Sequence, residues 1–576
     1  MGTAGVKKIN MIGTSLPEYV FIRVCIFALR YTTPIFLACL AVQVALHGGG
    51  FTATLRENIV AKLLLGYAVA DLLYAVLVWR PYARQRLADK AEHPEPPSRA
   101  ERRAFLERCL AHVPDVERYL RLWFLGADPE EIRRDNLREF LLWAFFDRAP
   151  RPHPDGEGWG ESPEVEQELD EYVDMVESYL GRKIEPGRGR AVGLLLTLDD
   201  VETRYRSVIW YALIAIVDFV THLRLARRGF HYHAQPREAF LSVIPHRLQN
   251  LFADRRSAAP DLGYWYRPHT AKNKRPVVFL HGIGVGLWVY VSFLASLNEE
   301  AQGDGEGQIG IIAIEYLPVS SRLTGAPLSR AEFLRQMTAI LASHGSDEDG
   351  WDRFVLTTHS YGSVLATHML RSEVLSPRIE AIVLIDPVSI LLHLPDVAFN
   401  FTRRQPRRAN EWLLWYFASM DPGVAHCLGR HFFWKDNIAW KEDLLSVVGA
   451  PKAIPAGDTK AEGGNRVGEL GGRDGERRRH VAVSLAEHDL IVDTLAVANY
   501  LAGDEEWYLA STAGQERSGP GKAASSNRAT GEGHIGHMTK DGIELLWFAG
   551  LDHAQVFDTR ESQQRLCRLV QRYCAK

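Results

Sequence analysis

The stretch Phe354-Val-Leu-Thr-Thr-His-Ser360-Tyr-Gly-Ser-Val-Leu-Ala366 decides the fold of the C-terminal half of this chain. Its apolar run at residues 354–358 predicts a buried strand, and the small and apolar residues from Gly362 onward predict a helix. A sharp turn between the two places Ser360 at its tip. The N-terminus of the helix then directs backbone N–H groups and partial positive charge toward the serine hydroxyl. We therefore predict that Ser360 is a nucleophile.

This stretch resembles the nucleophile elbow of the α/β-hydrolase family, which reads G-x-S-x-G. Gly362 matches the last glycine of that motif, whereas Thr358 stands where the first glycine is usual. The resemblance covers about residues 275–573. It implies a mostly parallel sheet flanked by helices, a helical cap, and a serine hydrolase activity.

Short apolar runs recur on both sides of the elbow and are separated by helical stretches. They occupy residues 276–280, 309–314, 381–385, 480–485 and 543–548. Continuous apolar strands with helices between them are typical of a parallel sheet covered on both faces. The spacing therefore predicts an α/β domain over residues 275–576.

A glycine-rich loop, His281-Gly-Ile-Gly-Val-Gly286, follows the first of these strands. By the resemblance, the backbone N–H groups of Ile283 and Tyr361 form the oxyanion hole, and His281 with Gly282 supports the loop. Such donors face the charge that develops on the attacked carbonyl. A dinucleotide site is excluded here because the glycines lack the G-x-G-x-x-G register.

An activated serine needs a base, and the base needs an orienting carboxylate. In the family both follow the nucleophile, with the acid first and the histidine last. Asp489 comes after the strand at 480–485, and His553 comes after the strand at 543–548. The resemblance implies that Asp489 orients His553, which acts as the base. Two other acids stay open at this point, namely Glu487 and Asp386.

Residues 391–448 look helical and lie where the family inserts its cap. The stretch is rich in aromatic residues: Phe399, Phe401, Trp412, Trp415, Tyr416, Phe417, Phe432, Phe433, Trp434 and Trp440. We expect an aromatic cap over a serine site to accept an apolar, lipid-like ester. The alternative is that these side chains form the core of the cap itself. Three polar, glycine-rich inserts at 302–308, 456–475 and 511–533 are expected to be disordered loops.

Two apolar segments, at residues 19–46 and 59–79, open the chain. A bilayer span needs about 20 mainly apolar residues, so they predict a membrane hairpin within residues 1–90. Asp71, near the middle of the second segment, would cost about 2.5–3.5 kcal/mol there. The alternative is a pair of buried helices that pack on the hydrolase domain.

Basic residues at both outer ends of the hairpin predict that its ends, and hence the hydrolase domain, face the cytosol. Residues 99–270 are expected to be mainly helical. Within them, the apolar run at 208–217 is short for a span and is expected to be a buried helix; the alternative is a third contact with the membrane.

The net charge of −4 gives no support for nucleic acid as a partner. The six cysteines show no CxxC pair, and no His or Cys cluster has ligand spacing, so we predict no metal and no cofactor. The sequence thus predicts a membrane-associated serine esterase or lipase that cleaves a small lipid-like ester through an acyl-enzyme on Ser360. An acyltransferase with the same triad and a non-catalytic scaffold with this fold remain open.

Overall fold

The computed structural model describes residues 13–48, 50–149, 162–298, 307–345, 350–449, 477–503 and 536–576. At its centre lies a ten-stranded sheet in the order β2-β1-β3-β5-β4-β6-β7-β8-β10-β9. The strands are β1 His231–Ala234, β2 Arg255–Arg256, β3 Gly263–Arg267, β4 Val277–Leu280, β5 Ile311–Glu315, β6 Phe354–His359, β7 Ile379–Ile385, β8 His480–Ala486, β9 His537–Met538 and β10 Ile543–Phe548. The run from β5 to β10 is parallel throughout. The predicted α/β class, a mostly parallel sheet flanked by helices, is confirmed.

Helices cover both faces of the sheet because successive side chains of its strands point to opposite sides. On β4, Val277 and Phe279 join one core with α12 (Val291–Ser296) and α22 (Arg560–Cys574). Val278 and Leu280 join the other core with α13 (Arg330–Ala342), α14 (Gly362–Leu370) and α20 (Thr494–Ala502). The uninterrupted apolar runs therefore reflect strands that are buried on both faces.

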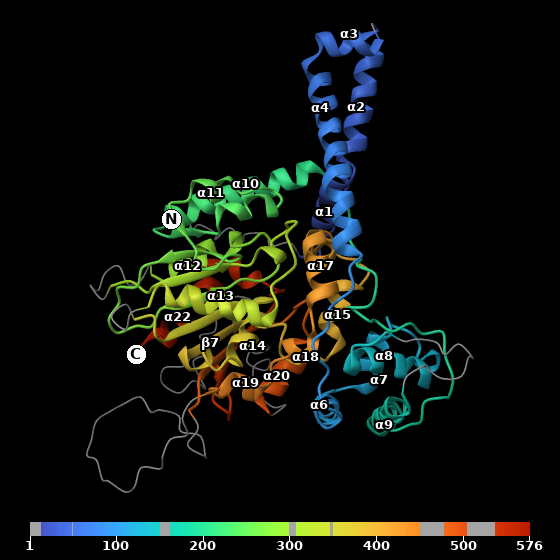
Figure 1. Cartoon of the computed structure of the whole chain (residues 1–576), viewed down its shortest axis with the longest axis vertical. Coiled ribbons are helices and arrows are strands. Elements are labelled where there is room, and N and C mark those ends of the chain that lie inside the picture. The colour runs from blue at the N-terminus through green and yellow to red at the C-terminus, as the bar shows by residue number, and fades with distance from the viewer. Residues whose placement is uncertain are drawn as a thin grey trace, which may run out of the picture.

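Two further groups of helices form a cap and a helical layer beside it (Figure 1). The cap contains α15 Pro395–Thr402, α16 Ala409–Leu414, the π-helical turn Trp415–Ser419, α17 Pro422–His431, α18 Trp434–Asn437 and α19 Lys441–Leu445. The helical layer contains α6 Arg99–Ala111, α7 Val116–Trp123, α8 Arg134–Phe146 and α9 Pro163–Leu180. The inserts expected at 456–475 and 511–533, and most of that at 302–308, lie outside the described residues.

The sheet begins earlier in the chain than the predicted start of the hydrolase domain at residue 275. Strands β1, β2 and β3 come from the region expected to be mainly helical, and β3 pairs antiparallel with β5. These strands have two to five residues and polar or aromatic side chains, so they lack the apolar run that marks the central strands. How the chain divides into domains stays a prediction.

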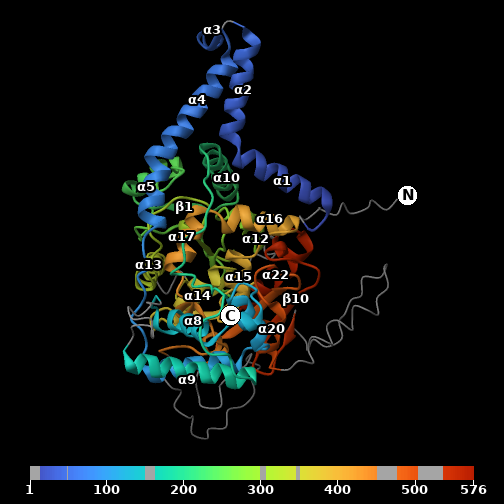
Figure 2. The ribbon, with the colours of Figure 1, turned by 90° about the vertical axis from the view of Figure 1, so that its right-hand side faces the viewer.

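The N-terminal segment is helical, as predicted, and part of it projects from the body of the protein (Figures 1 and 2). Its helices are α1 Leu16–Arg30, α2 Thr32–His47, α3 Gly50–Glu57 and α4 Ile59–Tyr74, from which the helical path runs on through α5 (Arg80–Tyr82) to Leu87. Helices α2 and α4 run side by side to α3 at the tip. By length and composition, Ile59–Leu87 is a candidate membrane span. Helices α1 and α2 are bent by 72° relative to each other, and they form a further candidate if the pair is taken as one span.

Asp71 is buried inside the protein, whereas its position in the middle of the second apolar segment suggested an exposed charge. Its carboxylate is buried and accepts hydrogen bonds from Thr33 Oγ1 at 2.5 Å, Tyr205 Oη at 3.1 Å and the backbone N–H of Val208 at 2.9 Å. Val208 is the first residue of α10 (Val208–Ala226). Asp71 therefore joins α2, α4 and the start of α10 at the base of the hairpin, where its charge has polar partners.

Candidate active site

The elbow around Ser360 has the strained backbone that a nucleophile turn requires. Strand β6 ends at His359, Ser360 adopts a φ of +51°, and α14 begins at Gly362. A positive φ is rare for residues other than glycine and is held here by neighbours, since the Ser360 N–H donates to the Ile385 carbonyl at 2.9 Å. Ser360 is only 5% exposed.

Two glycines allow the loops around Ser360 to approach one another. A Cβ on Gly362 would lie 2.3 Å from the Leu280 carbonyl oxygen, so only glycine lets α14 pack this close to β4. A Cβ on Gly282 would lie 2.8 Å from both the Ser360 Cβ and His359 Nδ1. Thr358, the departure from the family motif, is fully buried in β6 and pairs with Leu280 and Leu384 of the neighbouring strands.

The structure brings Ser360, His553 and Asp489 into one hydrogen-bonded chain. His553 Nε2 lies 2.8 Å from Ser360 Oγ, and His553 Nδ1 lies 2.7 Å from Asp489 Oδ2. The other oxygen of Asp489 accepts from the N–H groups of Ile491 at 2.7 Å and Val492 at 3.0 Å. These bonds fix the carboxylate, and the carboxylate in turn fixes the imidazole with Nε2 toward the serine. This is the geometry that a serine nucleophile and its base require.

Neither competing acid is hydrogen-bonded to the imidazole of His553, although a carboxylate oxygen of Asp386 lies within 4.8 Å of a ring nitrogen of His553. Glu487 accepts from the Gly550 N–H at 2.7 Å on the exposed side of the turn. Asp386 is buried and accepts from the N–H groups of Ala486 at 3.1 Å and Ala554 at 3.0 Å. Asp386 thus ties the end of β8 to the residue after His553. It contacts the loop that carries the imidazole, while Asp489 contacts the imidazole itself.

Charges around His553 control its protonation. Burial alone would lower the pKa of His553, but the charge and hydrogen bond of Asp489, with Asp386 and Asp552 beyond it, raise that pKa to about 9. Burial also raises the pKa of Asp386 to about 7, and the nearby Asp489 adds to this effect. The surroundings therefore stabilise a protonated imidazole, which is the state that a base reaches after it takes a proton.

The glycine-rich loop at 281–286, which is predicted to supply an oxyanion donor, lies against the elbow at Gly282. Among the described residues, no acceptor faces the backbone N–H of Ile283 or that of Tyr361. His281 donates from Nδ1 to the Gly282 carbonyl at 2.8 Å and accepts at Nε2 from the Tyr316 N–H at 3.0 Å, so it braces the loop in its neutral form. Burial lowers the pKa of His281, which agrees with this role.

Tyr290 and Asp552 support the site and were not found from the sequence. Tyr290 Oη accepts from the Gly282 N–H at 3.2 Å and contacts His359 Nδ1 at 2.7 Å, so it links the oxyanion loop to the elbow. Asp552 Oδ1 accepts from the N–H groups of His553 at 2.7 Å and Leu490 at 2.9 Å. The Asp-His pair at 552–553 was a usable signal, whereas nothing in the sequence marked Tyr290.

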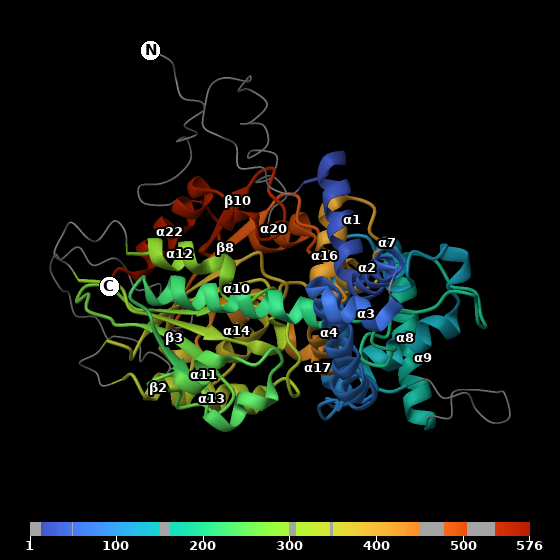
Figure 3. The same cartoon turned by 90° about the horizontal axis from the view of Figure 1, so that it is seen from above.

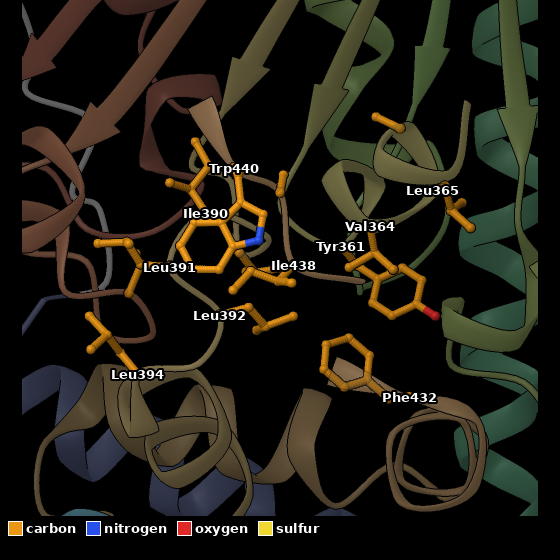
Figure 4. Close-up of a cluster of buried hydrophobic side chains, with 14 of the residues drawn as sticks. Tyr361, Val364, Leu365, Ile390, Leu391, Leu392, Leu394, Phe432, Ile438 and Trp440 are labelled. Atoms are coloured by element: carbon orange, nitrogen blue, oxygen red, sulfur yellow. The ribbon is translucent and has the colours of Figure 1, made fainter. Parts of the chain in front are cut away.

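The aromatic residues of the cap pack in two places. Phe432 and Trp440 join the main core beside Tyr361 and the segment from Ile390 to Leu394 (Figure 4). Trp412, Trp415 and Phe417 join a smaller cluster with Ile22 and Ile26 of α1. Much of this aromatic surface therefore holds the cap onto the hydrolase core and onto the N-terminal helices.

Within the described parts of the chain, one group of acidic and histidine side chains is close enough to hold a metal, and it consists of Asp386, Asp489 and His553. Each of these side chains already has hydrogen-bond partners inside the site. Oxygen and nitrogen ligands of this kind can bind a divalent cation, but here the hydrogen bonds account for the arrangement.

A Gly282→Ala substitution is expected to disrupt the site with little effect on the remainder of the fold. The new methyl group displaces Ser360 or His359, and we expect ester hydrolysis to fall at least about tenfold, because small misplacements of reacting groups are costly. Gly325→Ala is the matched control, since a Cβ there meets no atom within 4 Å. Steady-state hydrolysis by both variants checks this, and equal activity of G282A and wild type would contradict the packing described.

Comparisons with known proteins agree with this fold. The sequence model described as "Alpha/beta hydrolase family" matches residues 277–534. Comparison with curated proteins gives no significant match. Among solved structures, a bacterial membrane phospholipase A is 11% identical with a TM-score of 0.32, and the match covers 63% of this chain and 93% of that one.

Two further solved structures are similar at the same level. Carboxylesterase CesB from Bacillus subtilis is 11% identical with a TM-score of 0.29, with 63% of this chain and 99% of that one covered. A putative lipase from Acinetobacter baumannii is 10% identical with a TM-score of 0.32, with 62% and 96% covered. At such low identity and TM-score these structures carry no argument about substrate. The family match and the sheet together show that the C-terminal half of this chain is a domain of the α/β-hydrolase family.

Proposed function

We propose that the protein is a membrane-associated serine hydrolase that cleaves the carboxylic ester of a lipid-like substrate. The observation that carries the proposal is the hydrogen-bonded chain from Ser360 Oγ through His553 to Asp489. A non-catalytic scaffold would not need these atoms at 2.8 and 2.7 Å. The alternative of acyl transfer to an alcohol or thiol uses the same groups and differs only in the acceptor.

In the proposed reaction, His553 Nε2 takes the proton of Ser360 Oγ as that oxygen attacks the ester carbonyl. The N–H groups of Ile283 and Tyr361 then stabilise the oxyanion, and Asp489 stabilises the imidazolium. The intermediate collapses when His553 returns the proton to the departing alcohol, which leaves an acyl group on Ser360. Water, activated by His553, releases the acid and restores the serine.

Three features favour an apolar substrate at a membrane. Ser360 is 5% exposed, so the ester would react at a group that is nearly shielded from water. The cap above it packs through its aromatic residues onto the helix α1, next to the hairpin. Helices α2 and α4 of that hairpin expose apolar side chains such as Leu37, Val42, Leu63 and Val69, which burial in hydrocarbon would stabilise.

We place the hydrolase domain on the cytosolic side of the membrane. Arg80, Arg84 and Arg86 lie in the last turns of the helical path that ends at Leu87, beyond the apolar segment at 59–79. An excess of Arg and Lys at the membrane edge is typical of cytosolic segments.

Substrate profiling with purified protein tests the proposed activity. We expect release of fatty acid from long-chain acyl esters in mixed micelles, at least about tenfold faster than from the matching short-chain ester, because each buried methylene contributes about 0.8 kcal/mol. Ser360→Ala is the blank. A folded wild-type protein that hydrolyses no ester of either kind would overturn the proposal.

The raised pKa of His553 predicts an alkaline activity profile. The base works in its neutral form, so kcat/KM should rise with pH up to a pKa of about 9 and fall about tenfold for each pH unit below it. Asp386→Asn removes one of the charges that raise this pKa, so its acid limb should move to lower pH. A pH–rate series with both proteins checks this. A profile that is flat from neutral to alkaline pH in wild type would contradict the described electrostatics.

Cys39 offers a native reporter of the proposed hairpin, because it is exposed on α2. In intact membranes we expect a water-soluble maleimide to leave Cys39 unlabelled, since hydrocarbon excludes the reagent and disfavours the thiolate. A cysteine introduced at exposed Val374, at the edge of the sheet where β7 begins, should be labelled on the cytosolic side. Mass spectrometry of the labelled peptides measures both, and rapid labelling of Cys39 would contradict insertion of the hairpin.

A further inference from the structure

Apolar side chains cover the outer surfaces of α1 and α10 at the base of the hairpin. On α10, four residues that lie along one side of the helix are 37–57% exposed, namely Leu213, Ile216, Phe219 and Val220. On α1, five are 51–74% exposed, namely Leu16, Val20, Phe21, Val24 and Phe27. Soluble proteins rarely expose apolar stripes of this length, which mark binding surfaces.

The opposite surface of each helix is fixed to the body of the protein. Ile22 and Ile26 of α1 pack in one cluster with Trp210 and Ile214 of α10. Helix α10 also packs against β1 and α12. The outer stripes therefore point away from the hydrolase domain.

Buried ions prevent α10 from crossing a membrane, although its length and composition alone would permit it. Asp218 in this helix pairs with Arg247 at 3.0 Å and with Arg322 at 2.9 Å, and Arg247 also pairs with Glu315 at the end of β5 at 2.7 Å. To become a span, α10 would have to leave this network and carry Asp218 into hydrocarbon without its partners. The expected burial at 208–217 applies to one side of α10, which carries Trp210, Tyr211 and Ile214, whereas Leu213 and Ile216 on its other side are exposed.

The same side of the molecule carries a third apolar element and a set of positive charges. Figure 3 shows α11 (Leu248–Phe252) beside α10 when the protein is seen from above, along the hairpin. Leu248 and Phe252 of α11 are 62% and 79% exposed. Arg227 and Arg228 are exposed directly after α10. Apolar helices bordered by arginines are typical of segments that lie at the surface of anionic bilayers.

The bend between α1 and α2 sets these elements relative to the membrane. The two helices meet at 72°, so α1 lies nearly in the membrane plane when α2 follows the bilayer normal. In Figure 1, α10 also runs across the direction of α2 and α4. With the hairpin along the normal of a flat boundary, the apolar stripes of α1 and α10 would therefore both lie close to the plane of that boundary.

We propose that α1, α10 and α11 form a docking face that rests on the headgroup–acyl boundary of an anionic phospholipid bilayer, while the hairpin inserts more deeply. This docking face consists of the exposed apolar residues of α1, α10 and α11 named above. The proposal rests on the proposed membrane anchoring of the hairpin. It assigns α10 as an in-plane helix that holds the hydrolase domain against the leaflet from which its ester is drawn.

Two sets of contacts connect the docking face to the active site. Asn410 of α16 donates to Asp552 Oδ2 at 2.8 Å, and its backbone N–H donates to the Gly13 carbonyl, just before α1, at 3.3 Å. Val285 of the oxyanion loop packs in the cluster that holds Ile22 and Ile26. These contacts connect the docking face to the loop that carries His553 and to the glycine-rich loop beside Ser360.

Depth-dependent fluorescence quenching tests the docking face on the full chain. Cys25 and Cys39 are first replaced by serine, which leaves four buried cysteines that resist labelling: Cys109, Cys427, Cys567 and Cys574. A thiol-reactive fluorophore is then placed at Ile216→Cys, at Val69→Cys in the hairpin, or at Val374→Cys. Each protein is reconstituted into vesicles of equimolar phosphatidylcholine and phosphatidylglycerol that carry nitroxide lipids with the quencher near the headgroup or near the chain end.

We expect the Ile216 probe, at a depth of about 5–10 Å, to be quenched at least about twofold more by the shallow nitroxide than by the deep one. The Val69 probe should show the reverse preference, and the Val374 probe should not be quenched. If the deep nitroxide quenches the Val69 probe and neither nitroxide quenches the Ile216 probe, the docking face is refuted and the hairpin anchor is retained. Deep quenching at Ile216 would make α10 a span, and absence of quenching at both would refute the anchor as well.

Discussion

Replacement of Ser360 by alanine is expected to lower kcat for ester hydrolysis by about 10⁶-fold, the loss seen when a serine nucleophile of this kind is removed. The oxyanion donors and the binding surface remain, so a rate about 10³–10⁴-fold above that in water can persist. The fold should be unaffected because the side chain of Ser360 contributes one hydrogen bond, to His553. Steady-state and single-turnover hydrolysis of one long-chain ester measure the effect.

The control for this variant is Ser343→Ala, which changes an exposed serine at the end of α13. It should retain wild-type kcat. If S360A kept more than about one-tenth of the wild-type rate with unchanged thermal unfolding, a different group would have to be the nucleophile.

Replacement of Asp489 by asparagine is expected to lower kcat by about 10⁴-fold, because an amide favours the wrong tautomer of His553 and no longer stabilises the imidazolium. Asparagine has nearly the same size and can still accept from Ile491 and Val492, so the turn should keep its shape. The matched variant is Asp386→Asn. Its amide has one acceptor oxygen, so one of the two backbone donors to Asp386, at Ala486 and Ala554, loses its partner. Its kcat should change less than about tenfold, since Asp386 contacts the loop and not the imidazole.

This pair of variants also separates the two acids that the sequence left open. Rates at the alkaline plateau are the appropriate measure, because Asp386→Asn is expected to shift the acid limb as well. A larger loss in D386N than in D489N would mean that Asp386 orients the base.

The central strands and the elbow could be predicted because burial on both faces leaves a continuous apolar run. Residues 354–358 and 480–485 are of this kind, and β6 and β8 begin at their first residues. Asp489 and His553 were predicted from the resemblance to the hydrolase family, which places its acid and its histidine after strand ends. The structure brings both side chains to Ser360, because parallel strands have their C-terminal ends at one edge of the sheet.

Features that depend on contacts between distant segments could not be predicted. The partners of Asp71 lie in α2 and at the start of α10, far from it in the sequence. The apolar segment around Asp71 therefore gave no sign that its charge has buried partners. Tyr290 has no local pattern that distinguishes it from a core aromatic, yet it links Gly282 to His359. The open face of α10 likewise follows from the packing of one side and the ion pairs of Asp218, neither of which hydropathy records.

The most direct measurement of the central claim is covalent labelling of the purified protein with a fluorophosphonate, followed by peptide mapping. An activated serine is phosphonylated because its base removes the proton as the oxygen attacks. The account predicts one adduct, on Ser360, that is lost in Ser360→Ala and strongly slowed in Asp489→Asn. A folded wild-type protein that carries no adduct, or that carries it on another residue, would contradict the account.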